Sequence, residues 1–318
     1  MSEILTDINL AAQTMNLVDG QLRAGLVGTD EMAKLVTDSY FAGQHLLIEG
    51  VPGVGKTETA KKLSQTIGGL VFGRVQGAPD KQPFDIIGIE FYNRQTDEFE
   101  PRFGALYADV LLLDEFNRMN TKTQAALYDA LSEGHAMIGT KQYDLSPGFF
   151  AVGTQNPNAT GQGTFPMGDP MRDRFGVSTY VGSPSKEDRL AVGRMYAAGT
   201  HNTQPNIVTT GQEVEYIKDV ISKVAIEDGA IALAANTFDG ISQLAGVEMK
   251  ADGHRSMLST LSIARARAVR EGKTQVTEAD VKSLLPYIMR HRFEVDADPS
   301  QLEAEKQTRI ADAIKKAA

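Results

Sequence analysis

One stretch constrains the fold of this chain more than any other. Residues 50–57 read GVPGVGKT; the apolar run Leu46–Ile48 precedes them, and the segment 59–63 that follows has the composition of a helix. In the order strand, glycine-rich turn, helix, this motif binds phosphate, because the backbone N–H groups of the turn and the N-terminus of the helix point at one anion. A chance glycine-rich turn is the alternative, but both flanks fit a phosphate site. The sequence therefore predicts a P-loop in an α/β fold.

The P-loop assigns roles to its own residues. Lys56 is expected to reach the β- and γ-phosphates of a nucleotide, and the hydroxyl of Thr57 is expected to bind Mg²⁺. The nucleotide-binding residues expected in this segment are Gly50, Pro52, Gly53, Val54, Gly55, Lys56, Thr57 and Glu58.

Two acids follow a second apolar run. Residues 110–113 are continuously apolar, which is typical of a strand buried on both faces of a parallel sheet, and Asp114 and Glu115 come directly after them. Carboxylates at the C-terminal end of such a strand lie where open α/β sheets bind ligands. Taken alone, the two acids could be a solvated strand end. With a P-loop upstream, Asp114 is expected to hold Mg²⁺ through water, and Glu115 is expected to polarise the attacking water.

A further buried strand is predicted at residues 149–152, and it runs into Gly153–Pro157. An amide directly after this strand would face the phosphates from beside the P-loop. Asn156 is therefore a candidate for positioning the attacking water. The alternative is that Asn156 caps a turn before Pro157.

Two segments between these strands stand out. The loop-rich stretch 76–104 contains the apolar run Ile86–Tyr92 and is too long for a plain connector. We interpret it as an insertion with a functional surface, the alternative being an ordinary packed excursion. Residues 135–146, with Gly139 at their centre, predict a β-hairpin.

The character of the chain changes at residues 199–211, which are polar, include Pro205 and have little apolar content. We therefore expect a nucleotide-binding core at 1–200, beginning with two helices, and a small all-α domain at 205–318 that ends in a tail helix. Capping boxes are predicted at Thr121, Ser185 and Thr277. The helices expected outside the P-loop motif include 4–18, 30–41, 212–222, 228–243, 254–271, 278–289 and 301–317.

Composition excludes several classes of function. The chain has no cysteine, which excludes disulfides, thiolate metal sites and a thiol nucleophile. Its five histidines are scattered, so a histidine-built metal site is not expected, and its net charge of −9 argues against a general nucleic-acid surface. No apolar run approaches a membrane span and the N-terminus lacks the features of a signal peptide. We therefore expect a cytoplasmic protein that is not inserted in a membrane.

Taken together, these motifs resemble those of the AAA+ ATPases, and more narrowly of the MoxR family, over about residues 28–292. The resemblance implies an AAA+ αβα core with a parallel sheet, a helical lid domain, and ATP and Mg²⁺ as cofactors. It places the insertion at about 76–104 and the hairpin at about 135–146 toward a pore or a client. The matching segments are the P-loop (Walker A), Arg74–Gln76, Asp85–Gly88, Leu112–Arg118 (Walker B), Gly153–Pro157 (sensor 1), Gly163–Pro166, Asp173–Phe175 and His291–Arg292.

The resemblance also assigns roles outside the P-loop. Asn156 matches the sensor-1 residue, and Arg174 matches an arginine finger that points at the nucleotide of the neighbouring subunit. Arg172, where the family usually has leucine, is the alternative finger. Arg255 falls where a sensor-2 arginine begins a lid helix and senses the γ-phosphate in its own subunit, although residues 253–255 read Gly-His-Arg in place of the family's Ser-Pro-Arg. A finger that acts on a neighbour implies a homo-oligomer, which in this family is a hexameric ring.

The implied function is an ATP-hydrolysing, chaperone-like remodelling motor. It would move its lid against its core and assist maturation, activation or metal or cofactor insertion of a protein client, with a partner that carries a von Willebrand factor A domain on a separate chain. One alternative is a helicase-like nucleic-acid motor, which the hairpin does not favour because its only basic side chains are Lys141 and His135. Another is a non-catalytic nucleotide switch or scaffold, which the intact set of Lys56, Asp114, Glu115 and Asn156 disfavours. No guanine-recognition motif follows the P-loop, so ATP is expected rather than GTP.

Overall fold

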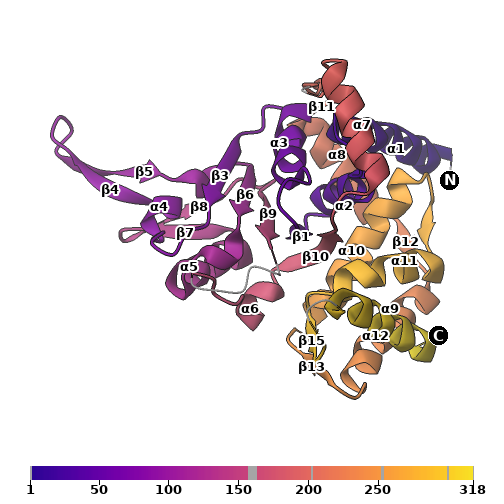
Figure 1. Cartoon of the computed structure of the whole chain (residues 1–318). Coiled ribbons are helices and arrows are strands. Elements are labelled where there is room, and N and C mark those ends of the chain that lie inside the picture. Colours follow the sequence, from indigo (N-terminus) through magenta and orange to yellow (C-terminus); the bar gives the residue numbers. More distant parts are fainter. Residues whose placement is uncertain (1, 157–162, 202, 252–253, 299–300, 318) are drawn as a thin grey trace.

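The computed structural model describes residues 2–156, 163–201, 203–251, 254–298 and 301–317. Its centre is a five-stranded parallel sheet in the order β10-β1-β9-β6-β3 (Figure 1). The predicted α/β fold with a parallel sheet is confirmed. Pro157 of the predicted sensor-1 segment and Gly253 before Arg255 lie outside the described residues. The strands are β1 (His45–Gly50), β3 (Phe72–Gln76), β6 (Val110–Asp114), β9 (Phe150–Gln155) and β10 (Phe175–Val181).

Side chains alternate between two hydrophobic clusters along each central strand. On β6, Leu112 belongs to the cluster on one face of the sheet, whereas Leu111 and Leu113 belong to the cluster on the other. This explains the continuous apolar run, because a strand covered on both faces has no side chain directed to solvent. The first face is covered by α1 (Ser2–Arg23), α2 (Asp30–Phe41) and α3 (Lys56–Thr66), and the second by α5 (Thr121–Glu133) and α6 (Asp169–Arg172).

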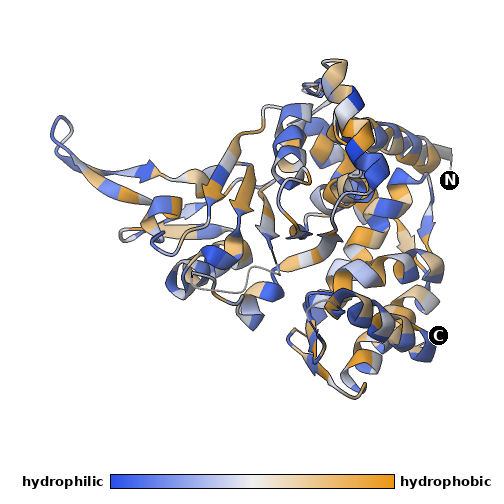
Figure 2. Cartoon of the chain, in the orientation of Figure 1, coloured by the Kyte–Doolittle hydropathy of each residue, from blue (hydrophilic) through white to orange (hydrophobic). Residues whose placement is uncertain are grey.

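The stretch after β3 forms a hairpin that extends away from the body of the molecule (Figure 1). It begins with the short helix α4 (Phe84–Ile87) and continues as the antiparallel strands β4 (Gly88–Asn93) and β5 (Glu98–Phe103). The chain then passes through η1 (Ala105–Tyr107) into β6. In Figure 2 the hairpin alternates between hydrophobic and hydrophilic residues.

The second predicted hairpin is present as β7 (His135–Ile138) and β8 (Lys141–Asp144). It packs against the base of the β4–β5 hairpin, where the ring centroids of Phe103 and Tyr143 lie 5.2 Å apart. Both hairpins therefore form one projection beside the sheet.

The C-terminal part is mainly helical, as expected, but the prediction of helices alone was incomplete. Three pairs of very short strands involve this part, and runs of two or three residues are too short to leave a hydrophobic period in the sequence. The helices of this part are α8 (Gly211–Ser222), α9 (Asp228–Ser242), α10 (His254–Arg270), α11 (Glu278–Met289) and α12 (Leu302–Ala317), and α7 (Lys186–Ala197) precedes them within the residues expected for the core. The strand pairs are β11 (Thr209–Thr210) with β2 (Ile67–Gly68), β12 (Ala225–Ile226) with β14 (Gln275–Val276), and β13 (Val247–Met249) with β15 (Phe293–Val295).

Two of the three predicted capping boxes are confirmed, at Ser185 and Thr277. The one predicted at Thr121 is wrong by one residue. Asn120 is the N-cap of α5, and its side chain accepts a hydrogen bond from the Thr123 backbone N–H at 3.0 Å. Asparagine caps a helix as well as threonine does, so the pattern could not distinguish neighbouring candidates.

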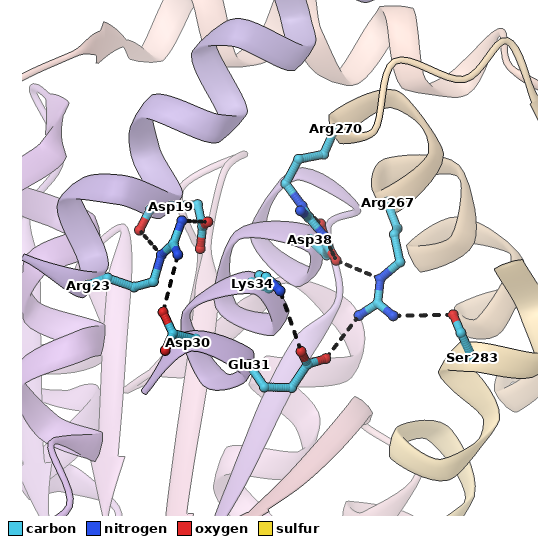
Figure 3. Close-up of polar contacts among 9 residues, drawn as sticks. All are labelled: Asp19, Arg23, Asp30, Glu31, Lys34, Asp38, Arg267, Arg270 and Ser283. Atoms are coloured by element: carbon cyan, nitrogen blue, oxygen red, sulfur yellow. Dashed lines mark hydrogen bonds and ion pairs between the residues drawn. The ribbon is translucent and has the colours of Figure 1, made fainter. Parts of the chain in front are cut away.

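A buried carboxylate joins the N-terminal helices to the C-terminal helices. Asp38 of α2 is fully buried and accepts hydrogen bonds from Arg267 and Arg270 of α10, at 3.0 and 2.6 Å (Figure 3). Truncating one partner of such a pair leaves a buried charge uncompensated, which costs about 3–5 kcal/mol. Residues of α8 to α12 also belong to the same hydrophobic cluster as α1 to α3. Among the described helices none is long and apolar enough to cross a membrane.

Candidate nucleotide site

The P-loop connects β1 to α3 through a turn that only glycine can make. Gly50 has φ +151°, and a Cβ atom there would lie 2.2 Å from the Val181 carbonyl oxygen. Gly53 and Gly55 have φ +82° and +83°, in the left-handed region, and α3 begins directly after them at Lys56. The loop therefore directs the N-terminus of α3 and its free N–H groups into one cavity.

That cavity, of about 460 Å³, brings together most of the predicted site residues. The P-loop contributes Pro52, Gly53, Gly55, Lys56, Thr57 and Glu58. The ends of β3, β6 and β9 contribute Arg74, Gln76, Asp114, Glu115, Thr154, Gln155 and Asn156. Parallel strands end at the same edge of the sheet, so residues far apart in the chain converge there.

Lys56 points back along the loop. Its Nζ donates to the Gly50 carbonyl oxygen at 2.6 Å. Burial lowers the pKa of Lys56 from its ordinary value, and the nearby carboxylates of Asp114, Glu115 and Glu49 oppose that shift. The Lys56 ammonium thus lies at the wall of the cavity, where the Gly50 carbonyl fixes it.

Asp114 is held by three side chains. Its Oδ1 accepts from the Thr154 hydroxyl at 2.6 Å, and its Oδ2 accepts from Arg74 Nη2 at 2.7 Å and from the Thr57 hydroxyl at 3.3 Å. Burial alone would raise the pKa of Asp114, but the hydrogen bonds from Thr154, Arg74 and Thr57 outweigh it and the pKa is lowered. Asp114 is therefore a fixed, ionised carboxylate beside Thr57.

The pair of oxygens from Thr57 and Asp114 fits a magnesium ion that arrives with a nucleotide. Both are hard oxygen ligands, which Mg²⁺ prefers. No group of three or more histidine, aspartate or glutamate side chains that could hold a metal ion occurs in the part of the chain that the structure describes. An ion held here would complete its coordination with phosphate oxygens and water, as Mg²⁺ does in nucleotide sites.

Glu115 adopts an unusual backbone conformation, with φ +53° for a residue that has a side chain. Its carboxylate Oε2 accepts hydrogen bonds from Gln76 Nε2 and from Arg118 Nη1, both at 3.1 Å. The Glu115 carbonyl lies over Gly77, where a Cβ atom would approach it to 2.1 Å. Strain of this kind in a non-glycine residue persists where the surroundings over-determine the conformation, as they do here.

Arg74 and Gln76 are site residues to which the sequence assigned no role. Both lie on β3, two positions apart, so their side chains share one face of the strand. Arg74 contacts Asp114, Gln76 contacts Glu115, and Arg74 Nη2 also donates to Gln76 Oε1 at 2.9 Å. Their period-two spacing at the end of a strand was the signal that could have found them.

A second cavity, of about 620 Å³, adjoins the first and shares Gly53 and Gly55 with it. Val54, a predicted P-loop contact, lines this cavity together with Leu26, Val27 and Met32. Gly50, the other predicted contact outside the first cavity, lines neither, and its carbonyl oxygen accepts from Lys56 Nζ. A cavity with apolar walls next to the phosphate-binding loop has the size and character to hold a base and ribose. The segment 25–32 before β1 is thus part of the candidate site, which the sequence did not indicate.

Comparison with known proteins agrees with this geometry. Residues 45–177 match the model of the ATPase family associated with various cellular activities (AAA), and residues 244–313 match the AAA lid domain. The uncharacterized protein YeaC of Bacillus subtilis is 30% identical over 268 residues, which cover 84% of this chain and 83% of that protein. The chaperone MoxR1 of Mycobacterium tuberculosis is 28% identical over 281 residues, 86% of this chain and 74% of its own. The chain belongs to the MoxR family of AAA+ ATPases.

A solved structure extends the likeness to the whole fold. The crystal structure of a candidate ATPase from Cytophaga hutchinsonii superimposes with a TM-score of 0.85 at 26% identity, covering 98% of this chain and 96% of that one. The parallel sheet and the helical C-terminal part of this MoxR-family chain therefore form the AAA+ core and lid.

The two arginines predicted to contact a nucleotide, Arg174 and Arg255, do not line the P-loop cavity of this MoxR-family chain. Arg174 and Arg255 line a third cavity, of about 440 Å³, with residues 43–45. β1 starts at His45 and reaches the P-loop at Gly50, so about 16 Å of strand separates the two cavities. The structure thus places Arg255 outside the cavity of its own P-loop, because α10 begins beside Asp173, whose Oδ2 lies 3.6 Å from Arg255 Nε.

Arg174 and Arg172 differ in what holds them. Arg172 Nη2 is 2.8 Å from Glu294 Oε1 on β15, and its Nη1 donates to the His291 carbonyl oxygen. The guanidinium of Arg174 lies over the ring of Tyr128 and donates from Nη2 to the Tyr128 hydroxyl at 2.8 Å. Its Nε and Nη1 have no hydrogen-bond partner among the residues that the structure describes. Arg174 therefore lines the third cavity with two buried nitrogens that no other described residue satisfies.

Proposed function

We propose that this chain is a magnesium-dependent ATP phosphohydrolase that works as a chaperone-like remodelling motor within a hexameric ring. The observation that carries the proposal is the convergence of Lys56, Thr57, Asp114, Glu115 and Asn156 on one cavity at the carboxyl edge of the sheet. This is the set of groups that phosphoryl transfer from a nucleotide to water requires.

Each residue has a role in that reaction. The P-loop N–H groups and Lys56 bind the β- and γ-phosphates, while Thr57 and Asp114 would hold Mg²⁺. When bound, the ion neutralises negative charge on the phosphates. Glu115 accepts a hydrogen bond from the attacking water and takes its proton as the new P–O bond forms and the bond to the leaving ADP oxygen breaks. Asn156, from the adjacent strand, orients that water.

Arg174 and Arg255 support a site shared between subunits. Both lie at the edge of the sheet opposite the P-loop, in one cavity, and Arg174 has two nitrogens without partners among the described residues. In a ring, this cavity would face the triphosphate of the next subunit. Arg174 then stabilises charge on the transferring phosphoryl group as an arginine finger, and Arg255 contacts the same phosphates from the lid, in place of those of its own subunit.

A protein client is favoured over nucleic acid by the β4–β5 hairpin. Phe91, Tyr92 and Phe99 are exposed on it, which suits apolar segments of a protein. The hairpin carries four acidic and two basic side chains over 88–103, so it would repel a phosphate backbone. The relative in Mycobacterium tuberculosis is named a chaperone. We extend this role to the present chain, with a von Willebrand factor A domain protein as partner and a cytoplasmic location.

Glu115→Gln tests the central assignment. The variant keeps the shape of the carboxylate but cannot take a proton, so ATP turnover should fall about 10²–10⁴-fold while binding of ATP is retained. Turnover is measured as phosphate release and binding as the anisotropy of a fluorescent ATP analogue. Unchanged turnover would refute the role of Glu115. Stoichiometric binding without any turnover in the unmodified protein would instead favour a nucleotide switch.

A further inference from the structure

A buried acid lies directly before the P-loop. Glu49 is the penultimate residue of β1 and is only 7% exposed. Its Oε1 accepts a hydrogen bond from Gln155 Nε2 at 2.7 Å, and Gln155 is the residue before Asn156. Glu49, at the end of the strand that carries the phosphate-binding loop, thus contacts the end of β9, which Asn156 follows.

The opposite charge comes from the lid. Arg290, directly after α11, is 5% exposed and lies with Nε and Nη2 at 3.0 and 2.9 Å from Glu49 Oε2. Its Nη1 and Nη2 also donate to the two carboxylate oxygens of Glu303 on α12, at 2.6 and 2.7 Å. Lys306 of α12 donates to the Arg290 carbonyl oxygen at 2.8 Å. Arg290 therefore bridges the P-loop strand and the C-terminal helix.

A carboxylate in this position is electrostatically unfavourable for the proposed ligand. The residue after it, Gly50, provides the carbonyl to which Lys56 Nζ donates, and Gln155, which donates to Glu49, lines the phosphate-binding cavity. The charge of Glu49 acts on Lys56, since it opposes the lowering of the Lys56 pKa. Without a counter-charge, a buried anion here would repel a nucleotide triphosphate, and weak internal screening would extend that repulsion over several ångströms.

We propose that Arg290 is a positioning residue of the nucleotide site, which neutralises Glu49 and is held in place by α12 through Glu303. The lid and the C-terminal helix thereby contribute to ATP affinity in cis, although neither reaches the phosphates. The inference rests on the proposed ATP site.

The test uses the full chain and the fluorescent non-hydrolysable analogue mant-AMPPNP with Mg²⁺, with Kd measured by anisotropy. Arg290→Met removes the charge and keeps much of the volume, and should raise Kd about tenfold or more, the effect of one uncompensated charge near the phosphates. Glu49→Gln alone should bind at least as tightly as the unmodified protein. The double variant Glu49→Gln/Arg290→Met should have a Kd within about threefold of the Kd of the unmodified protein, because the carboxylate that repels the phosphates is gone.

Arg270→Met is the matched control. Arg270 is also a buried lid arginine paired with a core carboxylate, Asp38 (Figure 3), but neither residue lines the two cavities at the P-loop. The Arg270→Met substitution should lower the melting temperature of the protein. At temperatures below the melting transition it should leave the Kd for the nucleotide analogue unchanged. A double variant that binds as weakly as Arg290→Met would overturn the inference, because Arg290 would then act through packing and not through charge. If Arg290→Met does not fold, the Kd of Glu49→Gln for mant-AMPPNP tests the proposal by itself. A tenfold higher Kd in Glu49→Gln than in the unmodified protein would contradict the proposal. Failure of the unmodified protein to bind the analogue would refute the ATP site itself.

Discussion

Replacing Arg174 by alanine should separate nucleotide binding from turnover. Arg174 lies in the third cavity and not beside its own P-loop, so each subunit should still bind ATP. An arginine finger contributes about 10³–10⁵ in rate in other nucleotide hydrolases, and a loss of that size is expected. The cost to folding should be small, on the order of 1 kcal/mol, because the side chain gives up one hydrogen bond and one ring contact with Tyr128.

A mixing experiment distinguishes a shared site from one completed within a subunit. Rings made only of Arg174→Ala lack the finger, and rings made only of Glu115→Gln lack the base, so each should be almost inactive. In mixed rings, an Arg174→Ala subunit supplies an intact Glu115 and a Glu115→Gln neighbour supplies an intact Arg174. At equal amounts about one quarter of the interfaces have this arrangement, because every interface in a ring is of the same head-to-tail kind.

The assay is steady-state phosphate release at constant total subunit concentration, after the two variants have been mixed and allowed to exchange. A rise to about one quarter of the unmodified rate is expected at the equal mixture. Arg172→Ala is the matched control, since Arg172 is engaged by Glu294, and it should retain most of its turnover. No recovery at any mixing ratio, or loss of turnover in Arg172→Ala but not in Arg174→Ala, would refute the assignment of a shared site to Arg174.

Three further outcomes concern stability and motion. Burial lowers the pKa of His45 to about 4, below the value of about 6.5 of an unfolded histidine. The contribution of neutral His45 to the free energy of unfolding is complete above the unfolded pKa of about 6.5. It is lost as the pH falls toward the folded pKa of about 4. Between neutral pH and pH 5 the free energy of unfolding, measured by chemical denaturation, should fall by about 2 kcal/mol less in His45→Asn than in the unmodified chain. An equal fall in the two proteins would refute this. Asp38→Ala should lower the free energy of unfolding by about 3–5 kcal/mol, because two buried guanidinium groups lose their partner, and a loss below about 1 kcal/mol would contradict it. The rate of amide hydrogen exchange in α10 should be the same with and without nucleotide. Faster exchange in α10 when nucleotide is bound would show that α10 separates from α2.

Patterns local in sequence predicted the sheet and much of the site. The run 110–113 is apolar at every position because both faces of β6 are covered, so strand and burial could be inferred together. The carboxylates of Asp114 and Glu115 then had to lie at the carboxyl edge, beside the P-loop, once the strands were taken as parallel. These inferences need only chain connectivity and the direction of strands.

Features that depend on register or on packing between distant segments could not be predicted. Gln76 pairs in register with Asp114 across β3 and β6, which puts Arg74 and Gln76 within reach of the two acids. The period-two spacing indicates that Arg74 and Gln76 share one face of β3, but nothing in the local sequence specifies the register that brings them to the acids. Arg255 was expected beside its own nucleotide because the family resemblance places a sensor-2 arginine there, but its position depends on how α10 docks against α2 and β10. Asp38, Arg267 and Arg270 determine that docking from far apart in the chain.

The way the lid is attached limits how this chain could do mechanical work. A lid that swings against the core would have to open the hydrophobic cluster shared by α1 to α3 and α8 to α12, and to expose the buried Asp38. Each of these steps costs several kcal/mol, since apolar burial contributes about 25 cal/mol per Å² and an unpaired buried charge costs more. ATP hydrolysis is better coupled to surfaces that are free to move. Arg174 and Arg255 line one cavity where the core and α10 meet, and in the proposed ring this cavity would face the neighbouring subunit. A change of contact between these arginines and a neighbouring subunit's phosphates would move whole subunits, each carrying its β4–β5 hairpin, as nearly rigid bodies.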